Sequence, residues 1–261
     1  MPGNQHFDTS LHLAAKYGHT NLVELFLGEG ASIEAMNQFN NTPLHNAAWY
    51  GHTDVVKLLL RKGALIEAMD EDNNTPLMKA AQNGHTDVVE VLLGEGTSIE
   101  AMDKTGSTVL HNAALRGYTN IVEILLGKGA LIETMNQFNH TPLLEAASWG
   151  HADVVEILLR EGASIEAMDK TGSTVLHYAA QCGYTNIVEI LLGKGASIEA
   201  MDTNSNTPLL LAAQYGHTNL VEMLLGKGAL IEAMQQYPVA RGCIVGLYRC
   251  SEDTSQERRF N

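Results

Sequence analysis

The fold of this chain is decided by a stretch at residues 42–66 that reads TPLHNAAWYGHTDVVKLLLRKGALI. Thr42 followed by Pro43 indicates the start of a helix, because a threonine side chain accepts hydrogen bonds from the free amides of a first turn and proline fits the first helical position. Leu44 and the two alanines behind it fall at helical spacing, so we expect this stripe to be buried. Gly51 then ends the helix, since glycine adopts a left-handed backbone without a steric penalty.

A second helix follows within the same stretch. Val55, Val56 and the three leucines at residues 58–60 make it apolar around most of its circumference. That distribution is expected of a helix packed between neighbours on both sides. Gly63 ends this helix, so the stretch predicts a pair of helices joined by a short turn.

The helix pair recurs along the chain. Aligning the sequence with itself places seven leucines in one column, each 33 residues after the last, and aligns glycines in two further columns. The leucine column holds Leu11, Leu44, Leu77, Leu110, Leu143, Leu176 and Leu209. A fixed period of this length means a linear array in which each copy buries its apolar face against its neighbours. We therefore expect a solenoid at residues 1–234, with repeats starting near residues 4, 37, 70, 103, 136, 169 and 202.

The repeated residues resemble the ankyrin repeat. That family has a period of 33 residues and the signature T-P-L-H-x-A, and this chain carries T-P-L-H at residues 42–45, a double alanine, and Gly51 followed by His52. The resemblance implies an all-α solenoid of stacked antiparallel helix pairs with projecting β-turn fingers, and a concave face lined by the fingers and the first helices. Glutamate replaces the usual finger asparagine in every repeat, at Glu34, Glu67, Glu100, Glu133, Glu166, Glu199 and Glu232.

Composition narrows the choice of partner and compartment. Sixteen Lys and Arg against thirty Asp and Glu give a formal net charge of -14, which disfavours nucleic acid and anionic lipid and favours a basic protein surface. The sequence has no apolar run of membrane-spanning length, its polar opening at residues 1–10 is not expected to act as a signal peptide, and its three cysteines are too few for a disulfide framework. We expect a monomer in the cytoplasm, or in the nucleus.

The seven copies differ at positions that the shared fold leaves free. Asn46, Trp49 and Tyr50 form a second helical stripe opposite the buried one, and the finger tips vary as well. In ankyrin-like proteins, matching positions commonly contact a protein partner. Exposed aromatic residues are enriched at binding hot spots, so we expect two anchor patches, centred on Trp49 and on Trp149. The predicted partner-binding residues are Tyr17, Phe39, Asn46, Trp49, Tyr50, Lys79, Asn83, Arg116, Phe138, His140, Trp149, Tyr178 and Tyr215.

Other recurring residues do not indicate a catalytic, metal-binding or phosphate-binding site. Histidines in one column lie a whole repeat apart, about 8 to 10 Å, which is too far for two of them to bind one zinc ion. We expect them to serve at the start of the second helices, and the methionine row that begins at Met36 to pack between fingers. A glycine-lysine-glycine run at residues 127–129 lacks the hydroxyl side chain of a phosphate loop and ends a helix instead. The sequence predicts no catalytic residue, no metal and no cofactor.

The expected function is that of a non-catalytic module that binds another protein through the concave face. One alternative is a scaffold or regulatory segment of a larger chain that carries an enzymatic or signalling domain elsewhere. Another is an enzyme that uses Cys243 or Cys250 in the tail at residues 235–261, which departs from the repeat. Within that tail we expect residues 243–248 to pack in part against the last repeat and residues 251–261 to be disordered.

Overall fold

The computed structural model describes residues 8–231, and these fall into two compact units, residues 8–137 and residues 138–231. Each unit is a stack of helix pairs. We call the helix that opens a pair the first helix and the other the second helix. The predictions for the tail at residues 235–261 lie outside the described residues.

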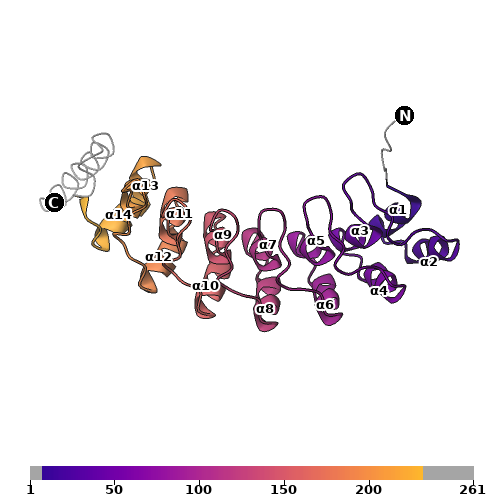
Figure 1. The fold of residues 1–261 in the computed structure, drawn as a ribbon. Helices are drawn as coiled ribbons and strands as arrows, with labels where there is room; N and C mark the ends of the chain where they lie inside the picture. Colours follow the sequence, from indigo (N-terminus) through magenta and orange to yellow (C-terminus); the bar gives the residue numbers. More distant parts are fainter. Residues whose placement is uncertain (1–7, 232–261) are drawn as a thin grey trace, which may run out of the picture. The chain divides into compact units, whose positions relative to one another are not determined.

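The first unit contains four pairs, in which the first helices form one layer and the second helices another (Figure 1). Small buried side chains allow the two layers to approach closely: Ala47 and Ala48 are fully buried, and so are Val56 and Leu59 opposite them. The helices are α1 (Ser10–Lys16), α2 (Thr20–Gly28), α3 (Pro43–Trp49), α4 (Thr53–Arg61), α5 (Pro76–Gln82), α6 (Thr86–Gly94), α7 (Val109–Arg116) and α8 (Thr119–Gly127).

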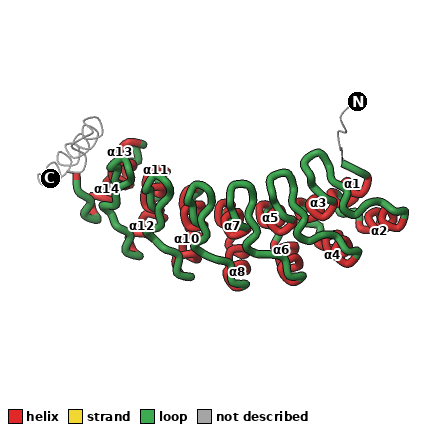
Figure 2. The backbone as a smooth tube through the Cα atoms, in the orientation of Figure 1, coloured by secondary structure: helices red, strands yellow, loops and turns green. Residues whose placement is uncertain are grey.

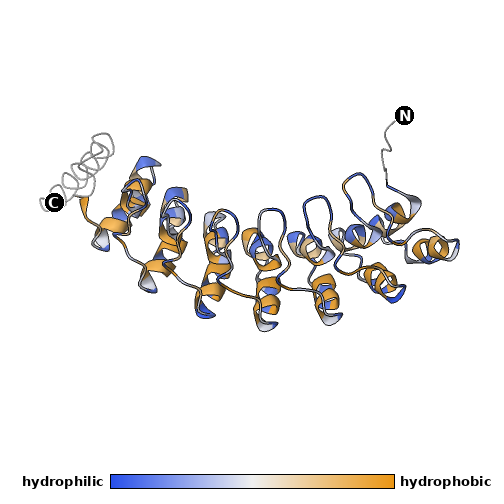
Figure 3. Cartoon of the chain, in the orientation of Figure 1, coloured by the Kyte–Doolittle hydropathy of each residue, from blue (hydrophilic) through white to orange (hydrophobic). Residues whose placement is uncertain are grey.

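The second unit repeats this arrangement with three pairs. In both units the loop before each first helix projects as a finger (Figure 2), and residues 8–231 contain no strand, only an isolated bridge between Met168 and Thr174. Hydropathy follows the same division, with apolar residues on the helices and polar residues along the fingers (Figure 3). The helices are α9 (Pro142–Ser148), α10 (Ala152–Arg160), α11 (Val175–Cys182), α12 (Thr185–Gly193), α13 (Pro208–Gln214) and α14 (Thr218–Gly226).

Each first helix begins after a threonine N-cap, as the sequence predicts, and four of the seven carry a histidine that does more than cap. The backbone N–H of Thr42 donates to His45 Nδ1 at 3.1 Å, so the ring carries its proton on Nε2, which donates to the Asn74 carbonyl at 3.0 Å. The histidine therefore ties its own helix to the next finger. Burial lowers the pKa of His45 from 6.5 to about 4, because the charged ring would lose its hydration.

The second histidine column stands at the start of the second helices, as expected. His52 and His85 are the N-cap residues of α4 and α6, and their Nε2 atoms lie 2.9 Å from the carbonyls of Lys16 and Trp49 in the preceding first helices. Gly51 has a φ of +76°, and a Cβ there would lie 2.5 Å from the His85 ring. The glycine column thus makes room for the ring of the following repeat.

The finger glutamates also connect repeats. Glu34 Oε1 accepts a hydrogen bond from the Leu65 amide at 2.8 Å, and Glu67 Oε1 accepts from the Ser98 amide at 2.6 Å. Their recurrence is therefore explained by the fold. The expectation for the methionine row is wrong: the side chains are 45% to 55% exposed at Met36, Met69, Met102, Met135, Met168 and Met201.

Candidate functional site

The predicted partner-binding residues gather at two places within each unit: the C-terminal ends of the first helices and the tips of the fingers. Tyr17, Tyr50 and Asn83 are the C-cap residues of α1, α3 and α5, and Trp149 is that of α9. We call the surface made by these helix ends and the finger tips the first-helix face.

Exposure distinguishes this face from the rest of each unit. Trp49 is 39% exposed and Trp149 is 59% exposed, so neither tryptophan is enclosed between neighbouring hairpins. All the strongly exposed aromatic side chains among residues 8–231 belong to the first-helix face. They are Tyr17, Phe39, Trp49, Tyr50, Phe138, Trp149 and Tyr215.

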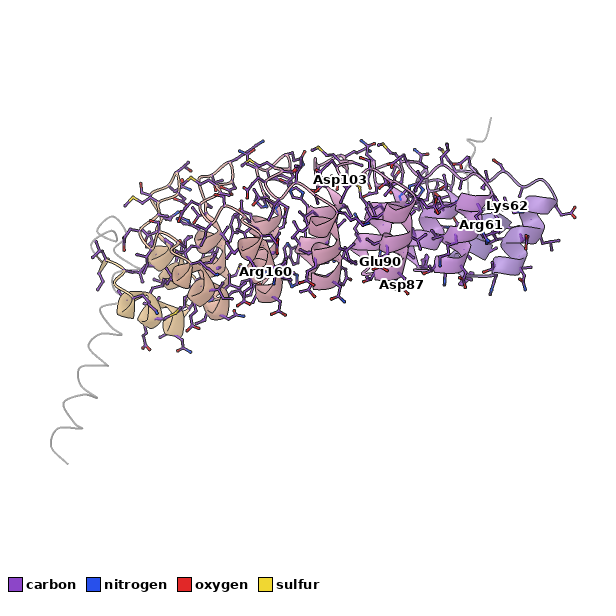
Figure 4. The ribbon with its side chains drawn as sticks, turned by 90° about the horizontal axis from the view of Figure 1, so that it is seen from below. Arg61, Lys62, Asp87, Glu90, Asp103 and Arg160 are labelled. Carbon is purple, nitrogen blue, oxygen red and sulfur yellow. The ribbon has the colours of Figure 1, made fainter. Side chains whose placement is uncertain are left out.

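The layer of second helices presents a different surface. In α4, α6 and α8, no large apolar side chain within the described residues is strongly exposed, and charged groups face solvent instead. Figure 4 shows this layer, with Arg61 and Lys62 at the end of α4 and Asp87 and Glu90 on α6. This layer therefore supplies charge without aromatic anchors.

A hollow in the first unit lies between the aromatic residues. Trp49 covers the ammonium group of Lys79, whose Nζ lies 5.2 Å from the indole centroid. Lys16 Nζ lies 5.4 Å from the ring centroid of Tyr50 and 5.8 Å from that of Tyr17. The residues that line the hollow are Asp8, Lys16, Asn37, Phe39, Asn41, His45, Asn46, Trp49, Tyr50 and Lys79.

The ammonium group of Lys79 is anchored by the finger that precedes α5. It forms an ion pair with Asp70, and the two side chains are only 12% and 3% exposed. Asp70 Oδ1 also accepts from the amides of Asp72 and Asn74 at 2.9 and 2.8 Å. Burial alone would raise the pKa of Asp70, but the hydrogen bonds from Lys79 and the finger amides lower it below its usual value. The ammonium group of Lys79 is therefore held by Asp70 and covered by the indole of Trp49, and it does not project freely into solvent.

The second unit builds a different cluster in the matching columns. Tyr178 takes the place of Lys79 and donates its phenolic proton to Asp169 Oδ2 at 2.7 Å. Its oxygen also lies 3.1 Å from His140 Nε2, and His140 Nδ1 lies 3.1 Å from Glu145 Oε1. Burial, and then the bond to Asp169, raise the pKa of Tyr178, so the phenol stays neutral. Because Tyr178 donates to Asp169, its oxygen accepts from His140 Nε2.

Some predicted residues are brought together and others are not. The structure joins Trp49 with Lys79, and His140 with Tyr178, while Arg116 stands exposed at the end of α7. Sequence reasoning missed Asp70, Glu145 and Asp169, which anchor these clusters. The aspartates recur in the finger column and so look structural, and only their contacts with variable side chains reveal the second role.

The part of the chain that the structure describes has neither a metal-binding cluster nor a membrane-spanning helix. There, no group of three or more His, Cys, Asp or Glu side chains is placed to hold a metal ion. No helix among the same residues has the length and apolar character needed to cross a membrane.

The family comparison agrees with this architecture. A family model for ankyrin repeats, built of three copies, matches residues 11–103, 95–169 and 162–235. The chain therefore belongs to the ankyrin repeat family. No curated protein matches the chain. Ankyrin repeats are generally protein–protein interaction modules, and the family is typically non-catalytic.

Proposed function

We propose that this chain is a non-catalytic module that binds a partner protein through its first-helix face. The observation that carries the proposal is the confinement of strongly exposed aromatic side chains to that face within residues 8–231. Tryptophan and tyrosine provide large contact areas with few rotatable bonds, and they dominate the binding free energy of many interfaces.

The charge of the partner and the compartment of the chain are inferred from the net charge and the thiol content. A net charge of -14 favours a partner with a basic surface at long range. The free, exposed thiol of Cys182 fits a reducing compartment such as the cytoplasm or the nucleus, where the chain would act as a monomer. A scaffold segment of a longer chain would use the same face, so the same test applies to it.

The test compares the two layers of the solenoid. The full chain is immobilised, partner proteins are captured from a cell extract and identified, and their affinities are then measured by calorimetry. Trp49→Ala combined with Trp149→Ala should weaken binding by about tenfold to a hundredfold, because both substitutions remove aromatic anchors. The matched control is Asp87→Ala combined with Glu90→Ala on α6, which should leave affinity unchanged (Figure 4). Equal affinity of the tryptophan variant and the wild type would contradict the proposal.

A further inference from the structure

The variable positions of the first helices in the first unit have a charge opposite to that of the whole chain. These positions on α1, α3, α5 and α7 are residues 13, 16 and 17 and their equivalents 33, 66 and 99 residues later. The charged residues among them are Lys16, Lys79 and Arg116, and all three are cations. The acidic excess of the chain therefore lies elsewhere, on second helices that carry residues such as Asp87 and Glu90 and on finger tips that carry Glu71 and Asp72.

Two of these cations are not neutralised by the protein. Lys79 is paired with Asp70, but no carboxylate within residues 8–231 lies within salt-bridge distance of Lys16 or Arg116. Lys16 instead lies over the rings of Tyr17 and Tyr50. Hydrogen bonding and charge interaction with Tyr50 raise the pKa of Lys16, which keeps its ammonium group charged.

The acidic groups close to these cations form no ion pair with them. Asp8, at the edge of the hollow, accepts a hydrogen bond from the neutral Asn37 Nδ2 at 2.8 Å and acts on Lys16 only through its charge. In the fingers, Asp70 holds Lys79, and Asp72 lies 3.7 Å from Lys104. Lys16 and Arg116 therefore remain available to a carboxylate that comes from outside.

The spacing of the two cations is suited to an extended chain. Lys16 ends α1 and Arg116 ends α7, and the packed row between them contains α3 and α5. Three steps of about 8 to 10 Å separate the two ends, a span of roughly 24 to 30 Å. An extended chain rises about 3.3 Å per residue and covers that span in about eight residues. Trp49 and Tyr50 lie on the route, close to Lys16.

We infer that the first unit binds an extended acidic segment of a partner protein, with carboxylate side chains about eight residues apart that meet Lys16 and Arg116. An apolar side chain between them packs on Trp49 and Tyr50. The inference rests on the proposed use of the first-helix face, and it differs from the proposed function in making the partner acidic where it contacts that face.

The overall negative charge does not prevent this binding. At physiological ionic strength the Debye length is about 8 Å, and the layer of second helices lies about one helix spacing, 8 to 10 Å, behind the first. Charges on the second helices are therefore largely screened at the first-helix face, whereas a direct contact with Lys16 or Arg116 is not. A basic partner selected by net charge alone remains the competing outcome.

The experiment selects peptides from a random displayed library of about twelve residues on the full chain at physiological salt. The affinities of the selected peptides are then measured by fluorescence anisotropy. We expect aspartate and glutamate to be enriched over lysine and arginine, with an apolar residue between two acidic positions. Lys16→Glu combined with Arg116→Glu should weaken binding by about tenfold or more, because two attractive contacts become repulsive.

A matched control keeps the total charge the same. Arg61→Glu combined with Lys62→Glu makes an identical change in net charge at the end of α4 (Figure 4) and should leave affinity within about twofold. The milder variant Lys16→Gln combined with Arg116→Gln, checked by circular dichroism, shows whether a loss of binding comes from unfolding. An equal loss in both charge-reversed variants would overturn the inference, since net charge alone would then decide affinity.

The remaining outcomes separate the inference from the proposed function. Basic or neutral peptides that depend on Trp49 would overturn the acidic segment and leave the first-helix face as the binding surface. Peptides insensitive to Trp49→Ala would count against both ideas. Failure to select any peptide would overturn the extended-segment inference, while the capture of whole proteins would still test the proposed function.

Discussion

The aspartates at one matching finger position, Asp70 in the first unit and Asp169 in the second, bind different side chains. In the first unit, Asp70 holds its finger and pairs with the ammonium group of Lys79. In the second unit, Asp169 holds the matching finger at the Ser173 amide, 2.9 Å away, but its other oxygen accepts from neutral Tyr178. The backbone role is the same, and a single variable column decides whether the buried carboxylate is neutralised by a cation.

The difference shows how function can change in a repeat protein at little cost to the fold. The finger needs a side-chain oxygen at this position, which Asp70 and Asp169 supply as carboxylates and Asn37 supplies as a neutral amide. Where the residue is an aspartate, its negative charge lies beneath the first-helix face. Lys79 cancels that charge in the first unit, whereas Tyr178 leaves it in place and links it to His140 and Glu145. The two units therefore offer partners different electrostatic surfaces on one backbone pattern.

The largest expected effect comes from removing the finger charge in each unit. Asp70→Asn should lower the free energy of unfolding by about 3 kcal/mol, because it leaves Lys79 mostly buried without its counter-ion. Asp169→Asn should cost only about 1 kcal/mol, because Tyr178 is neutral and can still donate to the amide oxygen. Urea denaturation followed by circular dichroism measures both. Equal losses would show that the ion pair of Asp70 contributes no more to the free energy of unfolding than the hydrogen bond of Asp169.

Acid should weaken both units. Burial lowers the pKa of one capping histidine in each unit, His45 in the first and His177 in the second. The folded pKa of His45, about 4, lies below its ordinary 6.5, so the unfolded chain binds a proton first and stability is lost as pH falls through this window. For His45 alone we expect a loss of roughly 2 kcal/mol between pH 7 and pH 5.

The variant His45→Leu sharpens this prediction, because Leu144 occupies the same column in the second unit. It should lose the bond to the Asn74 carbonyl, at a cost of about 1 kcal/mol at pH 7, and should remove part of the acid sensitivity. Hydrogen exchange at pH 7 and pH 5, corrected for intrinsic rates, reports the opening free energy of each unit. Unchanged acid sensitivity in this variant would assign the effect to other groups.

A smaller effect is expected from the phenol of the second unit. Tyr178→Phe removes the donor to Asp169 and the acceptor for His140 and should cost about 1 kcal/mol of unfolding free energy. The control is Tyr215→Phe, which removes an exposed hydroxyl that contacts Gln181 at 3.2 Å and should change stability very little. A similar cost for both variants would show that the hydroxyl of Tyr178 contributes no more to stability than the exposed hydroxyl of Tyr215.

The smallest effect distinguishes the two tryptophans. Trp49→Leu should cost about 0.5 kcal/mol more than Trp149→Leu, because Trp49 is less exposed and covers the ammonium group of Lys79. Thermal or urea denaturation of both single variants gives the comparison. A larger cost at Trp149 would show that the contact between Lys79 and the indole adds nothing to stability.

Much of the fold was readable from the sequence because it depends on local rules that recur. Thr42 and Pro43 start a helix through local capping, as the matching Thr-Pro pairs of other repeats do, and the positive φ of Gly51 favours glycine. The period then fixes how the pairs stack. The methionine row was misjudged because its side chains lie at the edge of the stack, where periodicity cannot show whether a neighbour covers them.

The candidate site was only partly readable. The sequence by itself determined the helix pairs, the solenoid class and the set of variable positions, because these follow from spacing along one chain. Only the tertiary structure decided that Lys79 pairs with Asp70, that Lys16 lies over Tyr17 and Tyr50, and that His140 reaches Tyr178. Electrostatics depends on distance and burial between residues that are far apart in the sequence, and only the folded chain sets those two quantities.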